Sequence, residues 1–423
     1  MSYSTQEKTG KELNRLFKED LPFHDWYRFV LSFPPHLVSD YLHKFNADPQ
    51  STVLDPFAGT GTTLVECKKY GISSIGFETN PIANFAATVK TSWDVSGKDL
   101  LSHATNIAVQ ASKNIKNKSF QFEQLTDDQY KLLIANSISD EPLRKALILL
   151  KTIDSEKSTF RDFERLAFAK QLVFSYSNLK FGPEVGVSRK KKTDIEVIDL
   201  WLEGIKKMAD DLDNVSNELR NTKAISLNCD ARSVTSQTLS LNSIDYIITS
   251  PPYPNEKDYT RTTRLENVIL GYIKTAKDLK SIKQYLLRSN TKNVYKGDGD
   301  DQWVNGIESI QQLSKHIEER RIELKKTSGF EKLYHKVVKL YFGGMAKHLN
   351  DLKPFLKSNA KLAYVVGEQA SYFRIPIHTA ELLGEVAESV GYKVEGIELF
   401  RERLSTTTQT LIKEEVLLLS LKK

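Results

Sequence analysis

Cysteine is scarce in this chain of 423 residues, which contains only Cys67 and Cys229. Two thiols exclude both a disulfide framework and a cysteine-rich metal cluster, and a pair of reduced, structural cysteines indicates an intracellular protein. Long apolar runs that could span a bilayer are also missing, and the polar N-terminus lacks the apolar segment of a secretory signal. We therefore expect a soluble, cytoplasmic protein with no membrane partner.

A strong excess of one charge sign is absent as well. Sixty Lys and Arg residues against 54 Asp and Glu residues give a formal charge of +6, which alone supports a polyanionic partner only weakly. The eight histidines do not cluster with cysteines or carboxylates at ligand spacings, so no metal site is predicted. The length suffices for one large, elaborated catalytic domain or two of ordinary size, and the sequence indicates no oligomeric state.

Seven short apolar runs that contain β-branched residues are predicted as strands. They are Thr52–Asp55, Ser74–Glu78, Ala224–Asn228, Ile244–Thr249, Lys361–Gly367, Val394–Phe400 and Glu415–Leu421. Helical patterns follow the first, second, fourth and fifth runs, as in a parallel sheet with crossover helices. The short polar connection Ser405–Thr410 instead predicts a hairpin and an antiparallel last strand.

Two stretches of helical periodicity interrupt this pattern, which predicts an α/β core with two helical insertions. We expect the N-terminal segment and first part of the core in 1–91, and a helical insertion that is a candidate target-recognition region in 92–222. The core continues in 223–273, a second helical insertion occupies 274–352, and the C-terminal part of the core is 353–423.

A glycine-rich turn follows the first predicted strand, in the order Asp55-Pro56-Phe57-Ala58-Gly59-Thr60-Gly61-Thr62-Thr63. Glycines let the backbone approach a ligand, and the N-terminus of the following helix adds oriented N–H donors. The turn lacks the Gly-Lys-Ser/Thr ending of a P-loop and the third glycine of the dinucleotide fingerprint. These absences favour S-adenosylmethionine over a nucleoside triphosphate or a dinucleotide.

Glu78 ends the second predicted strand, where its carboxylate is placed to accept hydrogen bonds from both ribose hydroxyls of that cofactor. Asn80 and Pro81 then resemble the N-cap and the first residue of a helix. A tight turn with a surface carboxylate is the alternative interpretation, and the segment described next argues against it.

Ser250-Pro251-Pro252-Tyr253 directly follows the buried strand Ile244–Thr249. Two prolines hold the chain in a stiff extended turn at the carboxyl end of this strand, the edge at which open α/β sheets bind ligands. Taken alone, the segment is equally well a proline-stiffened loop. Together with the glycine-rich turn it indicates a methyltransferase active site.

The residue types suit methylation of an aromatic exocyclic amine, a poor nucleophile because its lone pair is delocalised into the ring. Ser250 Oγ and the Pro251 carbonyl are placed to accept the two amino hydrogens, which directs the nitrogen lone pair toward the methyl donor. Tyr253 would stack on a base flipped out of the duplex. Methylation at carbon 5 needs a nucleophilic thiolate, and neither cysteine lies in a Pro-Cys loop, which disfavours that reaction.

The segments DPFAGTGTT and TSPPY resemble motifs I and IV of the DNA amino-methyltransferases, the family that forms N4-methylcytosine and N6-methyladenine. The resemblance covers the seven predicted strands but not the insertions, and implies a Rossmann-like class I methyltransferase fold. It also implies S-adenosylmethionine as cofactor, double-stranded DNA as partner and a companion restriction endonuclease acting on the same site. The Ser-Pro-Pro-Tyr form is associated with cytosine N4, and Asp-Pro-Pro-Tyr is commoner for adenine. Motif I precedes motif IV here, whereas many cytosine-N4 enzymes have the permuted order.

The resemblance also implies which residues form the site. Ser250, Pro251, Pro252 and Tyr253 would be catalytic, and Glu78 would bind ribose. The cofactor pocket would otherwise include Asp55, Phe57, Gly59, Thr60, Gly61, Thr62, Asn80, Asp230 and Ala231, with Asp230 contacting the adenine amino group. Phe33 and Pro34 resemble the segment called motif X, which closes over the methionine end; core packing is the equal alternative for Phe33.

Contacts to DNA are predicted downstream of the Ser-Pro-Pro-Tyr segment at Lys257, Tyr259, Arg261 and Arg264. A capped helix turn with ordinary surface charges is the alternative there. Arg189 and Lys190 belong to a basic run that either contacts DNA phosphates or forms a solvated loop. The same two interpretations apply to Arg401 and Arg403, near the predicted last hairpin. No recognition sequence follows from these residues.

Three other functions stay open. An N6-adenine methyltransferase would share the mechanism and differ in the base. An RNA guanine-N2 methyltransferase can use a similar turn, although its Pro-Pro-Tyr segment usually begins with Asp or Asn. A non-catalytic nucleic-acid-binding protein could retain the cofactor fold, but the intact Ser250 to Tyr253 segment argues against decay.

Overall fold

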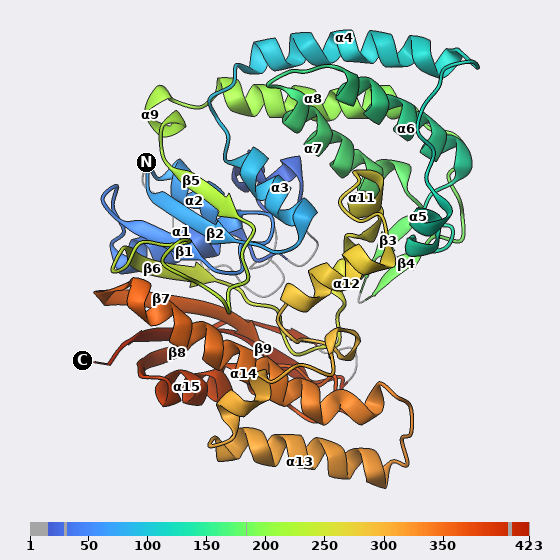
Figure 1. The fold of residues 1–423 in the computed structure, drawn as a ribbon. Helices are drawn as coiled ribbons and strands as arrows, with labels where there is room; N and C mark the ends of the chain where they lie inside the picture. The colour runs from blue at the N-terminus through green and yellow to red at the C-terminus, as the bar shows by residue number, and fades with distance from the viewer. Residues whose placement is uncertain (1–15, 29–31, 183, 405–407, 423) are drawn as a thin grey trace.

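A seven-stranded sheet forms the centre of the protein in the computed structural model, which describes residues 16–28, 32–182, 184–404 and 408–422. The strand order is β5-β2-β1-β6-β7-β9-β8 (Figure 1). The first five strands in this order are parallel, and β9 runs antiparallel to both β7 and β8. The prediction of a mostly parallel Rossmann-like sheet with an antiparallel last strand is confirmed.

The strands lie where the apolar runs predicted them. Their bounds are β1 Thr52–Asp55, β2 Ser73–Phe77, β5 Ala224–Leu227, β6 Ile244–Thr249, β7 Leu356–Gly367, β8 Tyr392–Leu404 and β9 Leu411–Leu421. The last two are much longer than their apolar runs because their ends alternate between buried and exposed residues, so they extend beyond the core as a two-stranded ribbon.

Successive residues of the central strands point into two different cores. Leu54 and Ile247 belong to the core under α13, α14 and α15, whereas the adjacent residues Val53 and Ile248 belong to the core under α1 and α2. Since side chains alternate across a strand, apolar residues at consecutive positions require both faces of the sheet to be covered. Figure 1 shows helices on both sides of the strands.

The helices fall into three groups. Those around the first strands are α1 Pro35–Phe45, α2 Thr62–Lys69 and α3 Pro81–Lys90. Those between α3 and β5 are α4 Gly97–Lys116, α5 Asp127–Leu132, α6 Asp140–Ser155, α7 Arg161–Gln171, α8 Val197–Asp213 and α9 Asn217–Arg220. The remaining helices are α10 Tyr259–Thr262, α11 Arg264–Ile269, α12 Ala276–Tyr285, α13 Glu308–Glu323, α14 Tyr334–Leu352 and α15 Thr379–Ser389.

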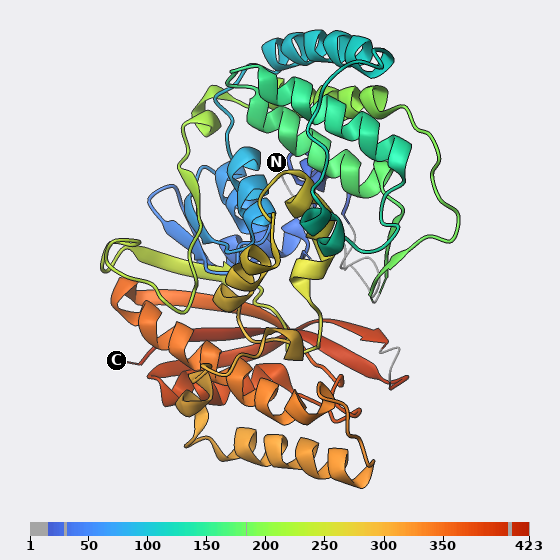
Figure 2. The same ribbon diagram turned by 45° about the vertical axis from the view of Figure 1, so that its right-hand side comes forward.

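Helices α4, α6, α7 and α8 form a layer of their own beyond α3 (Figures 1 and 2). Their apolar faces build a separate core, which includes the fully buried Trp201 and also receives Phe23, Trp26 and Tyr27 from the N-terminal part of the chain. Amphipathic helices that cannot reach the sheet bury their apolar stripes against each other in this way. Helix α13 packs on α14 on the opposite side of the sheet.

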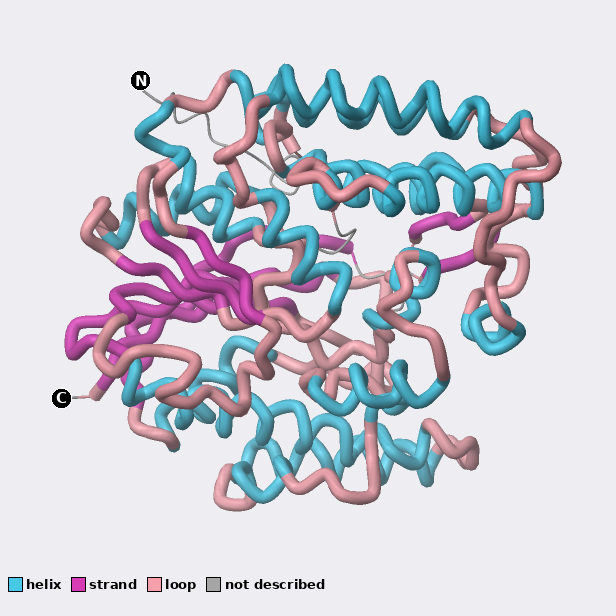
Figure 3. Tube along the Cα trace, turned by 45° about the horizontal axis from the view of Figure 1, so that its top comes forward, coloured by secondary structure: helices cyan, strands magenta, loops and turns pink. Residues whose placement is uncertain are grey.

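One element within the first helical stretch was not predicted. A two-stranded antiparallel sheet forms from β3 Leu179–Phe181 and β4 Val185–Val187, separate from the large sheet (Figure 3). Each strand has three residues, too few for a periodic signal of strand spacing. Figures 1 and 2 both place this hairpin on the same side of the molecule as the extended ends of β8 and β9.

No helix of the described part of the chain is both long enough and apolar enough to cross a membrane.

Candidate active site

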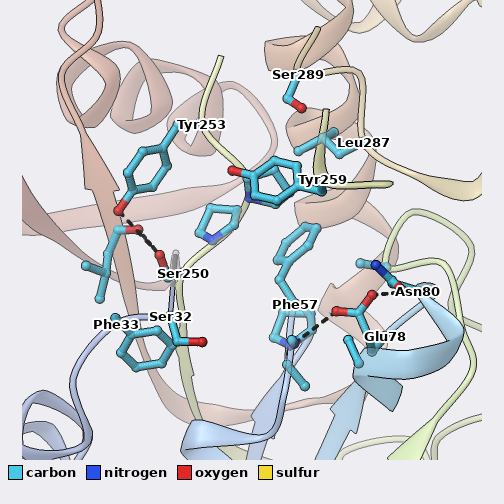
Figure 4. A pocket seen from close by; sticks show the side chains of 18 of the residues that line it. Ser32, Phe33, Phe57, Glu78, Asn80, Ser250, Tyr253, Tyr259, Leu287 and Ser289 are labelled. Carbon is cyan, nitrogen blue, oxygen red and sulfur yellow. Dashed lines mark hydrogen bonds between the residues drawn. The ribbon is translucent and has the colours of Figure 1, made fainter. Parts of the chain in front are cut away.

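A pocket of about 340 Å³ opens at the carboxyl ends of the parallel strands, a volume in the range typical of small-molecule sites. The turns that follow β1, β2, β5 and β6 all contribute to its lining (Figure 4). The predicted site residues among the lining are Phe33, Pro34, Phe57, Gly59, Thr62, Glu78, Asn80, Asp230, Ala231, Ser250, Pro251, Pro252, Tyr253, Lys257 and Tyr259. Five separate sequence segments thus meet in one pocket.

Both glycines of the glycine-rich turn have left-handed backbone conformations. Gly59 has φ +51°, and a Cβ built on it would meet nothing within 4 Å, so its open side faces the pocket that it lines. Gly61 has φ +83° and caps α2; a Cβ there would lie 2.9 Å from Cβ of Ala87 in α3. The first glycine leaves room for a ligand, and the second lets α3 approach the turn.

We expect the Gly61→Ala substitution to destabilise the fold and to weaken cofactor binding, because Ala87 must move away and α3 with it. Gly71→Ala is the matched control: Gly71 has φ +71°, but its added Cβ would have an ordinary 3.8 Å contact with Leu219. The backbone strain common to both is about 1–2 kcal/mol. Thermal melting and titration with S-adenosylhomocysteine should show the larger loss for Gly61→Ala; equal losses would contradict the close-approach argument.

Thr60 and Gly61 lie behind the lining of the pocket, on the side of the turn that faces α3. Lys90 of α3 is 1% exposed and donates to the Thr60 carbonyl (2.9 Å). Burial lowers the pKa of Lys90 to about 7. Thr60 and Gly61 therefore determine the shape of the turn, and neither is among the residues lining the pocket.

Glu78 is held by the backbone on both sides. Its carboxylate accepts hydrogen bonds from the Gly59 N–H (3.0 Å) and the Asn80 N–H (2.6 Å), both drawn in Figure 4. Burial raises the pKa of Glu78 to about 7, and the two hydrogen bonds oppose this shift. The carboxylate joins the glycine-rich turn to the start of α3 and still lines the pocket.

Asn80 occupies the N-cap position of α3 and Pro81 its first turn, as the sequence predicted. The Asn80 side chain does not cap the helix. Its Nδ2 donates to Thr263 Oγ1 (2.9 Å), and its Oδ1 accepts from Asn267 Nδ2 (3.1 Å). The amide therefore links this wall of the pocket to α11.

Asp55 is not among the lining residues, although it was expected in the cofactor pocket. Its carboxylate lies at 0% exposure, where it accepts hydrogen bonds from Thr249 Oγ1 (2.6 Å) and the Phe57 N–H (3.1 Å). Burial raises its pKa to about 6. Thr249 immediately precedes Ser250, so Asp55 joins the end of β1 to the end of β6 from behind the pocket.

Ser250 and Tyr253 face each other across the turn that follows β6 (Figure 4). Ser250 Oγ donates to the Val365 carbonyl (3.1 Å) and lies 3.4 Å from the Tyr253 hydroxyl. A hydroxyl has one donor and two acceptor positions, so a donor from Tyr253 leaves one acceptor position on Ser250 Oγ for a ligand. Burial raises the pKa of Tyr253, so its phenol keeps its proton.

The Tyr253 ring packs closely on the neighbouring strand. A Cβ on Gly367, the last residue of β7, would lie 3.0 Å from Cε2 of this ring. Glycine at this position leaves room for the ring beside Ser250.

Phe33, Pro34 and Phe57 also line the pocket. Phe33 also packs against the core under α1, so the two roles considered for it are compatible. Phe57 makes an edge contact with His348, at 5.0 Å between ring centroids. Burial lowers the pKa of His348 to about 4, so its ring is neutral.

Asp230 and Ala231 are fixed by side chains that lie behind them. The Asp230 carboxylate binds the Arg232 guanidinium (2.8 Å), which also binds Asp300 (2.7 Å). The Ala231 carbonyl accepts from His348 Nδ1 (2.9 Å). Arg232 thus connects this wall of the pocket to the second helical stretch.

The predicted DNA-contacting residues separate into three sets. Lys257 and Tyr259 line the pocket, whereas Arg261, Arg189 and Lys190 are exposed away from it. The Arg264 guanidinium donates to Thr260 and to the Leu132 carbonyl, an internal structural role.

Lys257 lies among charges from three elements. Burial lowers its pKa and nearby Arg403 lowers it further, whereas Glu184 and Glu414 oppose the shift. Glu184 belongs to the turn of the β3–β4 hairpin, so this hairpin reaches the neighbourhood of the pocket.

Several lining residues were not expected from the sequence. They are chiefly the 285–293 segment, with Tyr285, Leu286, Leu287, Ser289 and Asn293, and the β8–β9 ribbon, with Phe400, Arg401, Arg403 and Glu414. Arg401 and Arg403 both bind Glu414. The sequence left Arg401 and Arg403 as either phosphate contacts or solvated surface cations, and the 285–293 segment has no motif that identifies it.

Comparison with known proteins gives a family match and several similar relatives. The model of a DNA methylase family matches residues 2–88, which include the glycine-rich turn and Glu78. The chain is 24% identical to the type II methyltransferase M.BsoBI of Geobacillus stearothermophilus, over 92% of this chain and 82% of that protein. It is 26% identical to the type II methyltransferase M.AvaI of a Nostoc species, over 89% and 80% respectively. A shorter match, 34% identical over 99 residues, is to the type II methyltransferase M.MjaII of Methanocaldococcus jannaschii.

The fold and these matches support one class of protein, the S-adenosylmethionine-dependent methyltransferases. Within this class they support the DNA amino-methyltransferases, and the family predicted from the two motifs is confirmed.

Proposed function

We propose that this protein transfers a methyl group from S-adenosylmethionine to the N4 amino group of a cytosine flipped out of double-stranded DNA. The observation that carries the proposal is the position of Ser250. Its hydroxyl donates to the Val365 carbonyl, which leaves its oxygen as an acceptor beside the Pro251 carbonyl in the same pocket as Glu78. Two acceptors suit the two hydrogens of one amino group.

The residues of the pocket fit the cofactor. Gly59 has open space where a side chain would stand, and Glu78 is a half-buried carboxylate at the correct strand end for a ribose. Asp230 is held by Arg232 at the neighbouring strand end, where it would meet the adenine amino group. When bound, S-adenosylmethionine supplies an electrophilic methyl group, and this chain orients the amine that attacks it.

The amine needs help because its lone pair is shared with the base ring. Hydrogen bonds to Ser250 Oγ and the Pro251 carbonyl favour a pyramidal nitrogen, whose lone pair can point at the methyl group. Pro251 and Pro252 hold these acceptors rigid, so little reorganisation is required. No covalent enzyme intermediate is involved.

Tyr253 is proposed to stack on the flipped base. We expect Tyr253→Ala to lower methyl transfer to duplex DNA roughly tenfold or more, since base–aromatic stacking contributes about 1–3 kcal/mol. Tyr253→Phe keeps the ring and loses only the 3.4 Å contact with Ser250, so it should retain most of the activity. Single-turnover transfer of labelled methyl groups tests both; equal losses in the two variants would argue for the hydroxyl instead of the ring.

DNA is proposed to lie across the pocket side that holds Lys257 and Tyr259, with the helical region 92–222 as the target-recognition region. The hairpin of β3 and β4 extends from this region toward Lys257, and Arg189 and Lys190 follow the hairpin with exposed side chains. The relatives are named type II methyltransferases, which supports a role beside a restriction endonuclease of the same specificity.

The base assignment is tested by incubating the protein with unmethylated double-stranded DNA and S-adenosylmethionine, followed by mass analysis of the nucleosides. N4-methylcytosine is the expected product. N6-methyladenine alone would overturn the base and leave the mechanism in place. Methyl transfer to RNA but not to duplex DNA would reassign the substrate.

A further inference from the structure

The pocket has a wall that comes from the second helical stretch, between α12 and a short turn at Thr291–Asn293. Leu286, Leu287, Ser289 and Asn293 of this segment line the pocket. Figure 4 shows Leu287 and Ser289 on the same side as Tyr259, across from Ser32 and Phe33.

Asn293 is a buried amide without a hydrogen-bond partner among the described residues. Its side chain belongs to a residue that is 1% exposed, and its Oδ1 is buried with no hydrogen bond. Its Nδ2 also donates to no residue in the described ranges. Buried polar groups are normally hydrogen-bonded, so an amide that lines a pocket in this state points to a ligand as its partner. A half-turn of the carboxamide exchanges Oδ1 and Nδ2, so the side chain can offer either its acceptor or its donor to that ligand.

The segment that carries Asn293 is clamped to the loop that follows Tyr253. The Glu256 carboxylate accepts hydrogen bonds from the Thr291 N–H (2.8 Å) and from Thr291 Oγ1 (2.7 Å). Asn290 Nδ2 donates to the Lys257 carbonyl (3.0 Å). Because the loop starts at the proposed stacking residue, these bonds fix Asn293 relative to the base half of the pocket.

We propose that Asn293 holds the flipped base, by donating a hydrogen bond from Nδ2 to the acceptor edge of the ring. This inference rests on the proposed function. Cytosine presents one amino donor group and two acceptors, N3 and O2. Ser250 and Pro251 account for the amino group in the proposed mechanism, so N3 and O2 need a donor, which a carboxamide supplies.

Two variants of Asn293 test the proposal, with single-turnover methyl transfer to unmethylated duplex DNA as the readout. Asn293→Ala should lower the rate about tenfold, the loss expected for one base contact. Asn293→Asp should lower it about tenfold further, because an ionised carboxylate has only acceptors to offer to N3 and O2. Affinity for S-adenosylhomocysteine, measured by calorimetric titration, should stay within about twofold of the wild-type value.

Asn290→Ala is the matched structural control. Asn290 is 0% exposed, and its amide bonds internally to Lys257, so its removal should lower the melting temperature. Asn293→Ala should leave the melting temperature unchanged, since the amide that it removes bonds to nothing in the described protein.

Three results would overturn the assignment. One is a loss of S-adenosylhomocysteine affinity that accounts for the whole loss of rate, which would place Asn293 on the cofactor. Another is an Asn293→Asp variant as active as Asn293→Ala. The third is a fall in melting temperature equal to that of Asn290→Ala. Failure of the proposed function is recognised separately, because it appears in the wild-type protein as a product other than N4-methylcytosine.

Discussion

Replacing Ser250 by alanine is expected to lower the rate of methyl transfer about 100- to 1000-fold, which is the usual effect of removing one preorganised hydrogen-bond partner of a reacting group. The Ser250 oxygen is positioned before the base arrives, because its hydrogen is committed to the Val365 carbonyl. Without it, the Pro251 carbonyl alone would hold the amino group, and the nitrogen lone pair would stay delocalised. Single-turnover transfer of labelled methyl groups to duplex DNA measures the rate.

Ser250→Cys separates the acceptor from the packing of the side chain. A thiol fills the space of the hydroxyl and is slightly larger, but its sulfur accepts hydrogen bonds weakly, so this variant should be almost as slow as Ser250→Ala. Both variants should bind S-adenosylhomocysteine with affinity close to that of the wild type, since Glu78, Gly59 and Asp230 are unchanged. Undiminished transfer in either variant would refute the role of Ser250.

Much of the fold could be predicted because the strands are short, apolar and close to their turn residues. Val53 and Leu54 are consecutive apolar residues that fill two different cores, the pattern that marks a strand covered on both faces. The two glycines and Glu78 were also local signals, since each follows a strand within a few residues. Local spacing of this kind is visible in one sequence.

The pocket walls from distant segments could not be predicted in the same way. Asn293 reaches the pocket through the bonds of Thr291 to Glu256, a contact across 35 sequence positions. Arg401 and Arg403 reach it on a ribbon whose length depends on pairing with β9. Such contacts depend on how distant elements pack against each other. None of these three side chains belongs to a sequence motif that could have identified it.

Asp55 shows how a motif residue can differ from its expected position. It was expected to touch the cofactor, yet it lies fully buried and accepts a hydrogen bond from Thr249. The same carboxylate orients the Phe57 N–H of the glycine-rich turn. Asp55 therefore sets the relation between the turn that forms the cofactor half of the pocket and the strand end that carries Ser250.

The affinity for the cofactor is expected to fall about tenfold between pH 8 and pH 6 because Glu78 becomes protonated. Ribose hydroxyls donate to the ionised carboxylate, so the cofactor binds best when Glu78 has lost its proton. Burial raises the pKa of free Glu78 to about 7. About nine-tenths of the molecules are therefore ionised at pH 8 and about one-tenth at pH 6, so binding weakens as the pH falls. Calorimetric titration with S-adenosylhomocysteine across this pH range measures the slope, that is, the change in cofactor affinity with pH.

Glu78→Gln should weaken cofactor binding about a hundredfold at pH 8 and remove the slope, because the amide carries no charge and hydrogen bonds to charged groups are worth about 1.5–3 kcal/mol each. Its amide nitrogen would also face the N–H of Gly59 or Asn80, which now donate to the carboxylate. Glu266→Gln is the matched control: burial raises the pKa of Glu266 to about 7 as well, but this residue binds Tyr27 and is not among the lining residues. The slope should survive in Glu266→Gln and disappear in Glu78→Gln; a slope that persists in Glu78→Gln would assign the titration to another group and separate Glu78 from the ribose.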